Sequence, residues 1–288
     1  MIGVIGGSGI YNLSNIEVIN SFNVSTPFGD TSDAILKIRI DSSEIFFLPR
    51  HGKNHKLSPT AVNYRANIFA LKSLGCTSIL SFSACGSLNK KFHPGDFVLV
   101  DQYLDHTRKR HNSFFEEGVV AHVSMAEPSC NRLRDLISQI LKKLNINHHD
   151  GGSYVAIEGP QFSSKKESLI YKNVFNCDVI GMTNMPEAKL AREAEICYQT
   201  IAMITDFDCW KDDAEHVSYD EIQKIFKDNI SKVEMILLSL SSRTLKLEGG
   251  NCDQGCNNSL ETGLVTDVNN LDKKDLQNFE LLVRKYIK

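Results

Sequence analysis

The sequence has no apolar run that approaches the roughly 20 residues needed to span a bilayer, so no membrane-spanning helix is expected. It also lacks a basic segment followed by a cleavable apolar one at its start, so we expect no secretory signal. Positive charge is not in excess, because 32 lysines and arginines stand against 35 aspartates and glutamates. A chain without a basic field does not attract nucleic acid or an anionic membrane. These absences favour a cytoplasmic protein with neither nucleic acid nor membrane among its partners.

The eight cysteines, in a chain without a secretory signal, are typical of reduced thiols in a cytosol. Cys85 lies in a glycine turn and is expected near a functional site. Five others stand in apolar or helical surroundings and are expected in the core: Cys76, Cys130, Cys177, Cys197 and Cys209. Cys252 and Cys256 form a C-x3-C pair, where a zinc site would need two further ligands that do not stand nearby in the sequence. We therefore expect no metal, and a local disulfide and two free thiols both remain open.

Short apolar runs alternate with segments of helical periodicity, which is typical of an α/β domain. Strands are predicted at residues 2–6, 35–40, 44–48, 78–82, 97–100, 153–157, 179–182 and 198–205, the second and third pairing as a hairpin. Helices are predicted at residues 58–74, 130–144, 164 onward, 186 onward, 219–243 and 274–286. Residues 102–121 are polar and irregular, which indicates a solvated loop or one that covers a ligand. Residues 246–270 are polar and glycine-containing, which indicates an excursion or a mobile loop.

Two acidic residues follow the longest of the apolar runs. The run at 198–205 ends abruptly in Asp206-Phe207-Asp208. Open α/β sheets bind ligands just outside the carboxyl ends of their strands. Carboxylates at i and i+2 in this place therefore predict the functional edge of the sheet.

Hydroxyls, backbone N–H groups and cations follow four other predicted strands. Such groups bind anions where strand ends converge. Singly, each has a simpler explanation, such as a tight turn at residues 6–9 or a surface salt bridge at Arg50. Together they predict an anion pocket beside the acidic pair, formed by Ser8, Arg50, His51, Ser83, Ala84 and Thr183.

An aromatic residue, Phe162, stands in the polar loop after the predicted strand at 153–157. Stacking on a planar base is one explanation for an aromatic ring in that place, and anchoring of the loop to the core is the other.

Motifs spread over most of the chain carry a family resemblance. They are, in order, GVIGGSGIY, TPFGDTSD, RHGKNHKLSP, VNYRANIFALKSLG, SACGSL, PGDFVLVDQYLD, AIEGPQFSS, GMTNMPEAKLARE and TDFDCW. From Ile2 to about Ser239 the sequence resembles the methylthioadenosine phosphorylases of the trimeric purine nucleoside phosphorylase superfamily. The resemblance implies a single α/β domain with a mixed central β-sheet flanked by helices. In it, residues 1–245 form the nucleoside phosphorylase part and residues 246–288 a C-terminal loop and helix.

The resemblance also implies a homotrimer that needs no cofactor, inorganic phosphate being a co-substrate. The implied reaction is phosphorolysis of S-methyl-5′-thioadenosine to adenine and 5-methylthioribose 1-phosphate, a step of purine and methionine salvage. The six residues of the predicted anion pocket would hold phosphate, Asp206 would address purine N7, and Asp208 would address the 6-amino group. The other implied substrate contacts are Phe162 at the base, Met182 at the ribose, Gly181, His122 from a neighbouring subunit, and Val217, Tyr219 and Ile222 around the methylthio group.

This chemistry sets a requirement on Asp206. The aspartate can share a proton with N7 of the leaving adenine only if its pKa is raised. A second carboxylate nearby and a partly dry pocket both raise a carboxyl pKa. Phosphate, held close by Arg50 and the hydroxyls, then attacks C1′ and stabilises the positive charge that develops on the sugar.

Two positions depart from the family pattern, Ser83 where threonine is commoner and Gly181 where some members have asparagine. The run GMTNMPEA is also similar to that of methylthioinosine phosphorylases, so the alternative is a purine nucleoside or methylthioinosine phosphorylase that acts on 6-oxopurines. A carboxylate facing a 6-oxo group is repelled, which favours adenine. Ser163 also stands where oxopurine-specific relatives carry glutamate. Two other classes are an NAD-dependent oxidoreductase, for which the acidic partner of the glycine turn is missing, and a non-catalytic purine-binding protein.

Overall fold

The structure, a computed structural model, describes residues 1–7, 17–41, 43–211, 219–241 and 252–288. Its centre is an eleven-stranded β-sheet, and a two-stranded hairpin lies apart from it. The strands of the sheet are β1 (Ile2–Gly6), β2 (Glu17–Phe22), β5 (Ile35–Ile40), β6 (Ser43–Pro49), β7 (Ser78–Ser87), β8 (Phe97–Leu99), β9 (Gln102–His106), β10 (His148–Asp150), β11 (Ser153–Ile157), β12 (Val179–Gly181) and β13 (Cys197–Phe207). The hairpin consists of β3 (Ser25–Thr26) and β4 (Gly29–Asp30).

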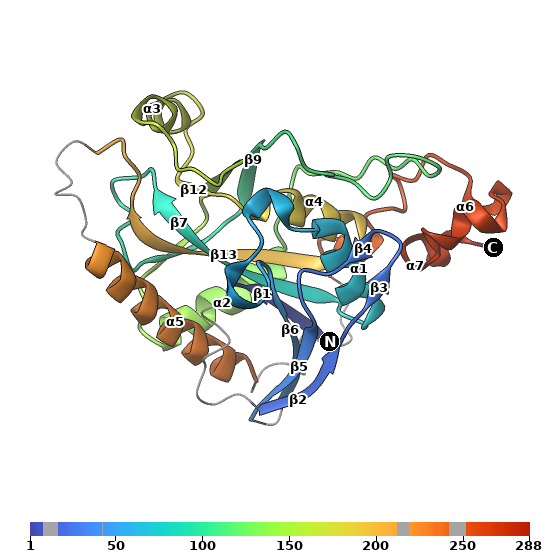
Figure 1. The fold of residues 1–288 in the computed structure, drawn as a ribbon, viewed down its shortest axis with the longest axis horizontal. Coiled ribbons are helices and arrows are strands. Elements are labelled where there is room, and N and C mark those ends of the chain that lie inside the picture. The colour runs from blue at the N-terminus through green and yellow to red at the C-terminus, as the bar shows by residue number, and fades with distance from the viewer. Residues whose placement is uncertain (8–16, 42, 212–218, 242–251) are drawn as a thin grey trace.

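Helices lie on both sides of the sheet (Figure 1). They are α1 (Tyr64–Ser73), α2 (Asn131–Lys143), α3 (Lys165–Asn173), α4 (Asn184–Glu193), α5 (Tyr219–Ser241), α6 (Lys273–Gln277) and α7 (Glu280–Val283). Short 3-10 turns cover Lys53–His55, Pro59–Ala61, Cys256–Asn258, Val268–Asn270 and Arg284–Tyr286. Among the described helices, none combines the length and apolar character that a membrane crossing requires.

The sheet is mixed. Its main path runs in the order β10-β8-β13-β7-β1-β6-β5-β2, and the inner strands β13, β7, β1 and β6 are parallel. Strand β8 pairs antiparallel with β13, β12 with β7, and β5 with β6, the last being the predicted hairpin. These pairings confirm the predicted fold class, a single α/β domain with a mixed central sheet.

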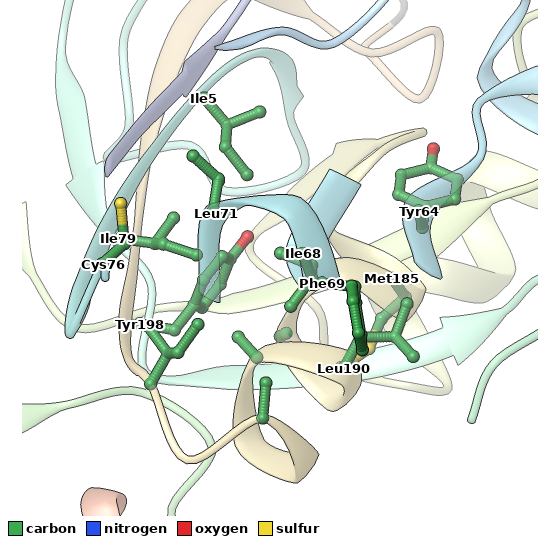
Figure 2. Close-up of a cluster of buried hydrophobic side chains, with 14 of the residues drawn as sticks. Ile5, Tyr64, Ile68, Phe69, Leu71, Cys76, Ile79, Met185, Leu190 and Tyr198 are labelled. Carbon is green, nitrogen blue, oxygen red and sulfur yellow. The ribbon is translucent and has the colours of Figure 1, made fainter. Parts of the chain in front are cut away.

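Alternate residues of the inner strands point to opposite faces of the sheet and build two core clusters. On one face Ile5 and Ile79 pack with α1 and α4, and on the other Val4 and Leu80 pack with α2 and α5. Figure 2 shows the first cluster, in which Ile5, Ile68, Leu71, Ile79, Leu190 and Tyr198 lie together. The helical layers therefore hold the parallel strands in place, and the strand ends at the edge of the sheet carry the polar residues.

The first predicted helix begins later than expected, at Tyr64. Asn63 accepts a hydrogen bond from the backbone N–H of Ala66 at 3.1 Å and caps the helix. The serine and proline that suggested an earlier start belong to the 3-10 turn Pro59–Ala61, and the extended conformation of Val62 separates that turn from α1.

The C-terminal residues are part of the core. Leu260, Val268 and Phe279 join the first cluster, and Cys252 and Cys256 join the second. The polar composition of residues 246–270 suggested a loop without such anchors, because the few apolar residues in it show no regular period. The predicted final helix is also interrupted, and consists of α6, α7 and a 3-10 turn.

Candidate active site

The candidate site lies where the parallel strands β7 and β13 reach their carboxyl ends, and the antiparallel strand β12 ends beside the last residues of β7. Strand β13 pairs in parallel with β7, and the register shifts between Ile204, which faces Cys85, and Asp206, which faces Gly86. Thr205 is thus the extra residue of a bulge, a feature that re-aims the following side chain. The strand was predicted to end at residue 205, but it continues through Phe207 because the bulge lets pairing resume. Asp206 therefore pairs with Gly86 inside the strand and does not follow the end of the strand.

Asp206 has a hydroxyl donor and a raised pKa. Thr205 Oγ1 donates to Asp206 Oδ1 at 2.6 Å and also contacts the carbonyl oxygen of Cys85 at 3.2 Å. Burial raises the pKa of Asp206, and the negative charge of Asp208 adds to the rise, while the Thr205 hydroxyl opposes it. The direction of this shift agrees with what an acid at this position requires.

Asp208 is more deeply buried, with 9% of its surface exposed. Burial raises its pKa as well. Its Oδ2 atom is buried and makes no hydrogen bond of good geometry to a described residue, although the nearby Ser168 hydroxyl and the backbone N–H of Cys209 lower the pKa of the carboxyl. A buried carboxylate oxygen without a donor is unfavourable by about 1–3 kcal/mol or more, so this atom is suited to accept an N–H group from a ligand. Gly86 permits the arrangement, because a Cβ on it would lie 3.1 Å from Ile180 Cγ2 and 3.5 Å from Asp208 Cβ.

Two of the predicted phosphate ligands meet although they are 100 residues apart. Ser83 Oγ and Thr183 Oγ1 are both buried and lie 3.2 Å from each other. The hydroxyl of Tyr154 lies 3.5 Å from Ser83 Oγ and accepts from the backbone N–H of Thr183 at 3.4 Å. Ala84 is exposed although it lies in a central strand, since the pairing of β7 with β1 ends at Ser81. The hydroxyls of Ser83, Tyr154 and Thr183 therefore lie together next to an exposed residue of the strand.

Arg50 is held in a buried ion pair that the sequence did not suggest. Its Nε and Nη2 atoms donate to the two carboxylate oxygens of Glu187 at 2.8 and 3.1 Å, and both side chains are 2% exposed. Nη2 also donates to Ser81 Oγ at 2.6 Å, and Nη1 donates to the carbonyl oxygen of Phe82 at 3.0 Å. Burial alone would lower the pKa of Arg50, but the Glu187 charge raises it above its ordinary value. The alternative of a surface salt bridge is therefore wrong, and Arg50 is fixed beside the residues that precede Ser83.

His51 is buried and neutral. Its Nδ1 lies 2.9 Å from the carbonyl oxygen of Leu57, and its ring stacks on His55 with the centroids 4.2 Å apart. Burial, reinforced by the charges of Arg50 and His55, lowers its pKa to about 4. A neutral ring that donates its Nδ1 proton to a carbonyl keeps a lone pair on Nε2. His51 can therefore accept a hydrogen bond from a protonated phosphate oxygen.

Arg110 ties the loop at residues 102–121 to the end of β12. Its Nη1 donates to the carbonyl oxygens of Met182 and Met185, both at 2.6 Å, and its Nη2 donates to the carbonyl of Glu158 at 2.9 Å. The segment was predicted to be irregular, but it begins with β9 and carries this buried arginine. Sequence composition predicted neither the strand nor the buried arginine. It does not reveal which cation of a basic cluster points inward.

The loop after β11 leaves Phe162 exposed. Its exposed fraction is 85%, so it does not anchor this loop to the core, and that alternative is wrong. The ring is available for contact with a ligand. The loop then ends in a capping box, in which Ser164 and Glu167 exchange hydrogen bonds at the start of α3, the helix predicted from residue 164 onward.

Comparison with known proteins decides the family. Residues 1–242 match the profile described as the phosphorylase superfamily. The chain belongs to this superfamily. A superfamily member from Cereibacter sphaeroides, an S-methyl-5′-thioadenosine phosphorylase, is 46% identical over 288 residues, which cover 100% of this chain and 99% of the relative.

Solved structures of the phosphorylase superfamily agree with this assignment. A methylthioadenosine phosphorylase from an Antarctic soil metagenomic library superposes with a TM-score of 0.91 at 39% identity, covering 98% of both chains. The methylthioadenosine phosphorylase of Schistosoma mansoni in complex with adenine has a TM-score of 0.84 at 37% identity, covering 92% of this chain and 98% of that one.

The structure describes only some of the remaining predicted site residues of this phosphorylase. Gly181 is buried, Met182 is partly buried, and His122 is exposed on a loop that Gly263 holds through a 2.7 Å backbone bond. Tyr219 and Ile222 belong to the beginning of α5, but their side chains lie outside the described residues. Ser8 and Val217 also lie outside them.

Two residues at this site escaped prediction, Glu187 and Tyr154. Glu187 lies in the first turn of α4, where a carboxylate suits the helix dipole, and it pairs with Arg50. A buried arginine requires a carboxylate partner, but the sequence did not indicate which one. Tyr154 gave no signal, because it lies inside an apolar strand.

Proposed function

We propose that this phosphorylase catalyses the phosphorolysis of S-methyl-5′-thioadenosine, producing adenine and 5-methylthioribose 1-phosphate. The observation that carries the proposal is the pair Asp206 and Asp208 at the end of β13, one partly buried and one buried carboxyl, both with raised pKa, near the hydroxyls of Ser83 and Thr183. A carboxyl of this pair can share a proton with the purine as it leaves, and the hydroxyls can donate hydrogen bonds to the incoming anion. The relatives described above support the same reaction.

Asp206 acts as the acid in this proposal. The leaving adenine carries negative charge as the glycosidic bond breaks, and a proton shared at N7 stabilises it. The buried position and the neighbouring Asp208 charge keep a proton on Asp206 at higher pH than usual. The Thr205 hydroxyl fixes the direction in which the carboxyl points.

Asp208 determines which base is accepted. Its unpartnered Oδ2 accepts the N–H of a 6-amino group, and it repels the oxygen of a 6-oxopurine. Phe162, exposed at the mouth, stacks on the base. An adenine nucleoside therefore fits this arrangement better than the 6-oxopurine alternative.

Phosphate binds to the predicted anion pocket. The hydroxyls of Ser83 and Thr183, the backbone at Ala84, the lone pair of His51 and the Ser8 turn surround it. The four hydrogen bonds of Arg50 to described residues leave one Nη1 N–H for a phosphate oxygen. Holding the nucleophile under C1′ removes most of the orientation entropy, and its charge stabilises the cationic sugar.

The complete site requires a second copy of the chain. We infer a homotrimer in which His122 of one subunit covers the 5′ end of the substrate bound to its neighbour. Its exposure supports this role. From the family resemblance we assign Val217, Tyr219 and Ile222 to the methylthio slot, Met182 to the ribose and Gly181 to the substrate contacts. Phosphate is the co-substrate without a further cofactor.

An assay of adenine release tests the proposal. Purified protein is incubated with S-methyl-5′-thioadenosine with and without phosphate, and in parallel with methylthioinosine and inosine. We expect rapid adenine release that depends on phosphate and little reaction of the 6-oxopurines. Release without phosphate would indicate hydrolysis, and a preference for inosine would refute the base assignment.

A further inference from the structure

Four cysteines from three distant parts of the chain meet in the second core cluster. Cys130 precedes α2, Cys197 is the first residue of β13, and Cys252 and Cys256 belong to the C-terminal segment. Their sulfur atoms all lie within 4.8 Å of one another, and all four residues are buried. The C-x3-C pair alone lacked two ligands in the sequence, and the fold supplies them as Cys130 and Cys197.

The spacing of the sulfurs fits a tetrahedral metal ion. Cys130 Sγ lies 3.6 Å from Cys252 Sγ, which lies 3.5 Å from Cys256 Sγ. Zinc–sulfur bonds of about 2.3 Å in a tetrahedral site place neighbouring sulfurs about 3.8 Å apart. The four cysteines are free thiols, so each sulfur can act as a ligand.

We infer that Cys130, Cys197, Cys252 and Cys256 form a structural zinc site with four thiolate ligands. Four soft sulfur ligands in tetrahedral arrangement select zinc among the common divalent ions. A site closed by four protein ligands has no open position for substrate or water, which is typical of a structural rather than a catalytic zinc.

The surroundings suit the negative charge of such a site. Arg132 Nη2 lies 3.5 Å from Cys197 Sγ, and Cys130 occupies the position that precedes the positive end of the α2 dipole. Thiolates are the form that binds metal.

The backbone around the cluster is built to hold it. Gly255 has φ of +70°, which glycine adopts without strain, and its N–H donates to the Cys252 carbonyl at 2.7 Å. This tight turn brings Cys252 and Cys256 together. Gln254 accepts from Asn131 N at 2.7 Å and donates to the Ser129 carbonyl at 2.9 Å, so the turn is fixed to the start of α2.

The zinc would join the C-terminal segment to the sheet far from the catalytic edge. Cys197 and Asp206 lie near opposite ends of β13, and nine residue steps along a strand span about 30 Å. Because the ligands are up to 126 positions apart, from 130 to 256, an ion held by all four restrains a large part of the unfolded chain. This inference does not depend on the proposed function.

Metal analysis of the full-length protein tests the inference. Protein purified with a phosphine reductant and dialysed against metal-free buffer is analysed by mass spectrometry for zinc. We expect about one zinc per chain in the wild type and in Cys177→Ser, a buried cysteine outside the cluster that serves as the control. Cys256→Ser should lose at least nine-tenths of it.

If Cys256→Ser does not fold, cobalt substitution of the wild-type protein tests the proposed zinc site. Wild-type protein reconstituted with cobalt(II) should show the intense visible bands of a tetrahedral thiolate site. Wild-type protein without zinc and without these bands would overturn the inference, as would zinc retained in folded Cys256→Ser. Protein prepared without reductant could instead contain no metal and have an intact mass four hydrogens below that of the reduced chain. That result would assign two disulfides to the cluster.

Discussion

The hydroxyl oxygen of Tyr154 lies 2.1 Å from the position that a Cβ on Gly181 would occupy. The two residues stand on the neighbouring strands β11 and β12, and the aromatic carbon that bears the hydroxyl is only 2.7 Å from the same position. A side chain at residue 181 and a tyrosine at residue 154 therefore exclude each other. Gly181, which departs from the asparagine of some family members, is explained by the ring that fills its place and reaches Ser83 and Thr183.

A double-mutant cycle measures this exclusion. Gly181→Ala should destabilise the wild type by about 1–3 kcal/mol, because the ring must move in a packed core. In a Tyr154→Leu background the same substitution should cost less, with a coupling of about 0.5–3 kcal/mol. Urea unfolding of the four proteins gives these values. Equal costs in the two backgrounds would show that the residues do not compete for space.

Breaking the buried ion pair between Arg50 and Glu187 should strongly lower the free energy of unfolding. Glu187→Ala leaves Arg50 buried without its carboxylate and should lower the free energy of unfolding by about 3–5 kcal/mol. Glu44→Ala, which removes the partly exposed pairs with Lys37 and Arg39, is the control and should cost far less, because water screens these charges. Similar unfolding midpoints for the two variants would contradict the assigned importance of the buried pair.

The Thr205 hydroxyl predicts the direction of a change in pH dependence. It lowers the pKa of Asp206, so Thr205→Val should raise that pKa further. Asp206 acts in its protonated form, and activity therefore falls as pH rises through the pKa in the folded enzyme. The alkaline limb of the kcat/KM profile should move to higher pH in Thr205→Val and stay in place in the exposed control Thr77→Val. Movement to lower pH would remove Asp206 from the acid role.

The Asp208 carboxylate predicts the base preference. Asp208→Asn replaces an acceptor by an amide that also donates, and this suits the oxygen of a 6-oxopurine. The ratio of kcat/KM for methylthioinosine to that for S-methyl-5′-thioadenosine should rise by about 10-fold or more. Steady-state kinetics with both nucleosides measures it, and an unchanged ratio would place the 6-position of the base elsewhere.

Much of the fold was predictable because buried strands and amphipathic helices leave clear periods in the sequence. The apolar runs that became β7 and β13 placed Ser83 and Asp206 on one edge, since parallel strand ends converge. Thr183 reaches Ser83 in a different way, because β12 runs antiparallel to β7, and the sequence did not indicate that direction. The bulge at Thr205 was not predictable, because an extra residue in a ladder depends on pairing with β7.

Interactions between distant side chains were the second limit. The partner of Arg50 and the inward direction of Arg110 depend on how the chain folds back. So does the meeting of Cys130 and Cys197 with the C-terminal pair Cys252 and Cys256, because neither of the first two is close to the other cysteines in sequence. Cys209 shows the reverse case: it was predicted in the core from its apolar neighbours, but it is exposed just past the end of β13. Cys85, by contrast, lies as expected near the site, 3.6 Å from Ser83 Oγ.

The most direct measurement is the single-turnover rate of adenine release by Asp206→Asn at saturating phosphate, compared with wild type. An asparagine keeps the shape of the side chain but cannot share a proton with N7, so we expect the rate to fall by about 10²–10⁴-fold while the KM for phosphate stays nearly constant. A rate equal to that of the wild type would contradict the account, because the leaving base would then need no acid on β13.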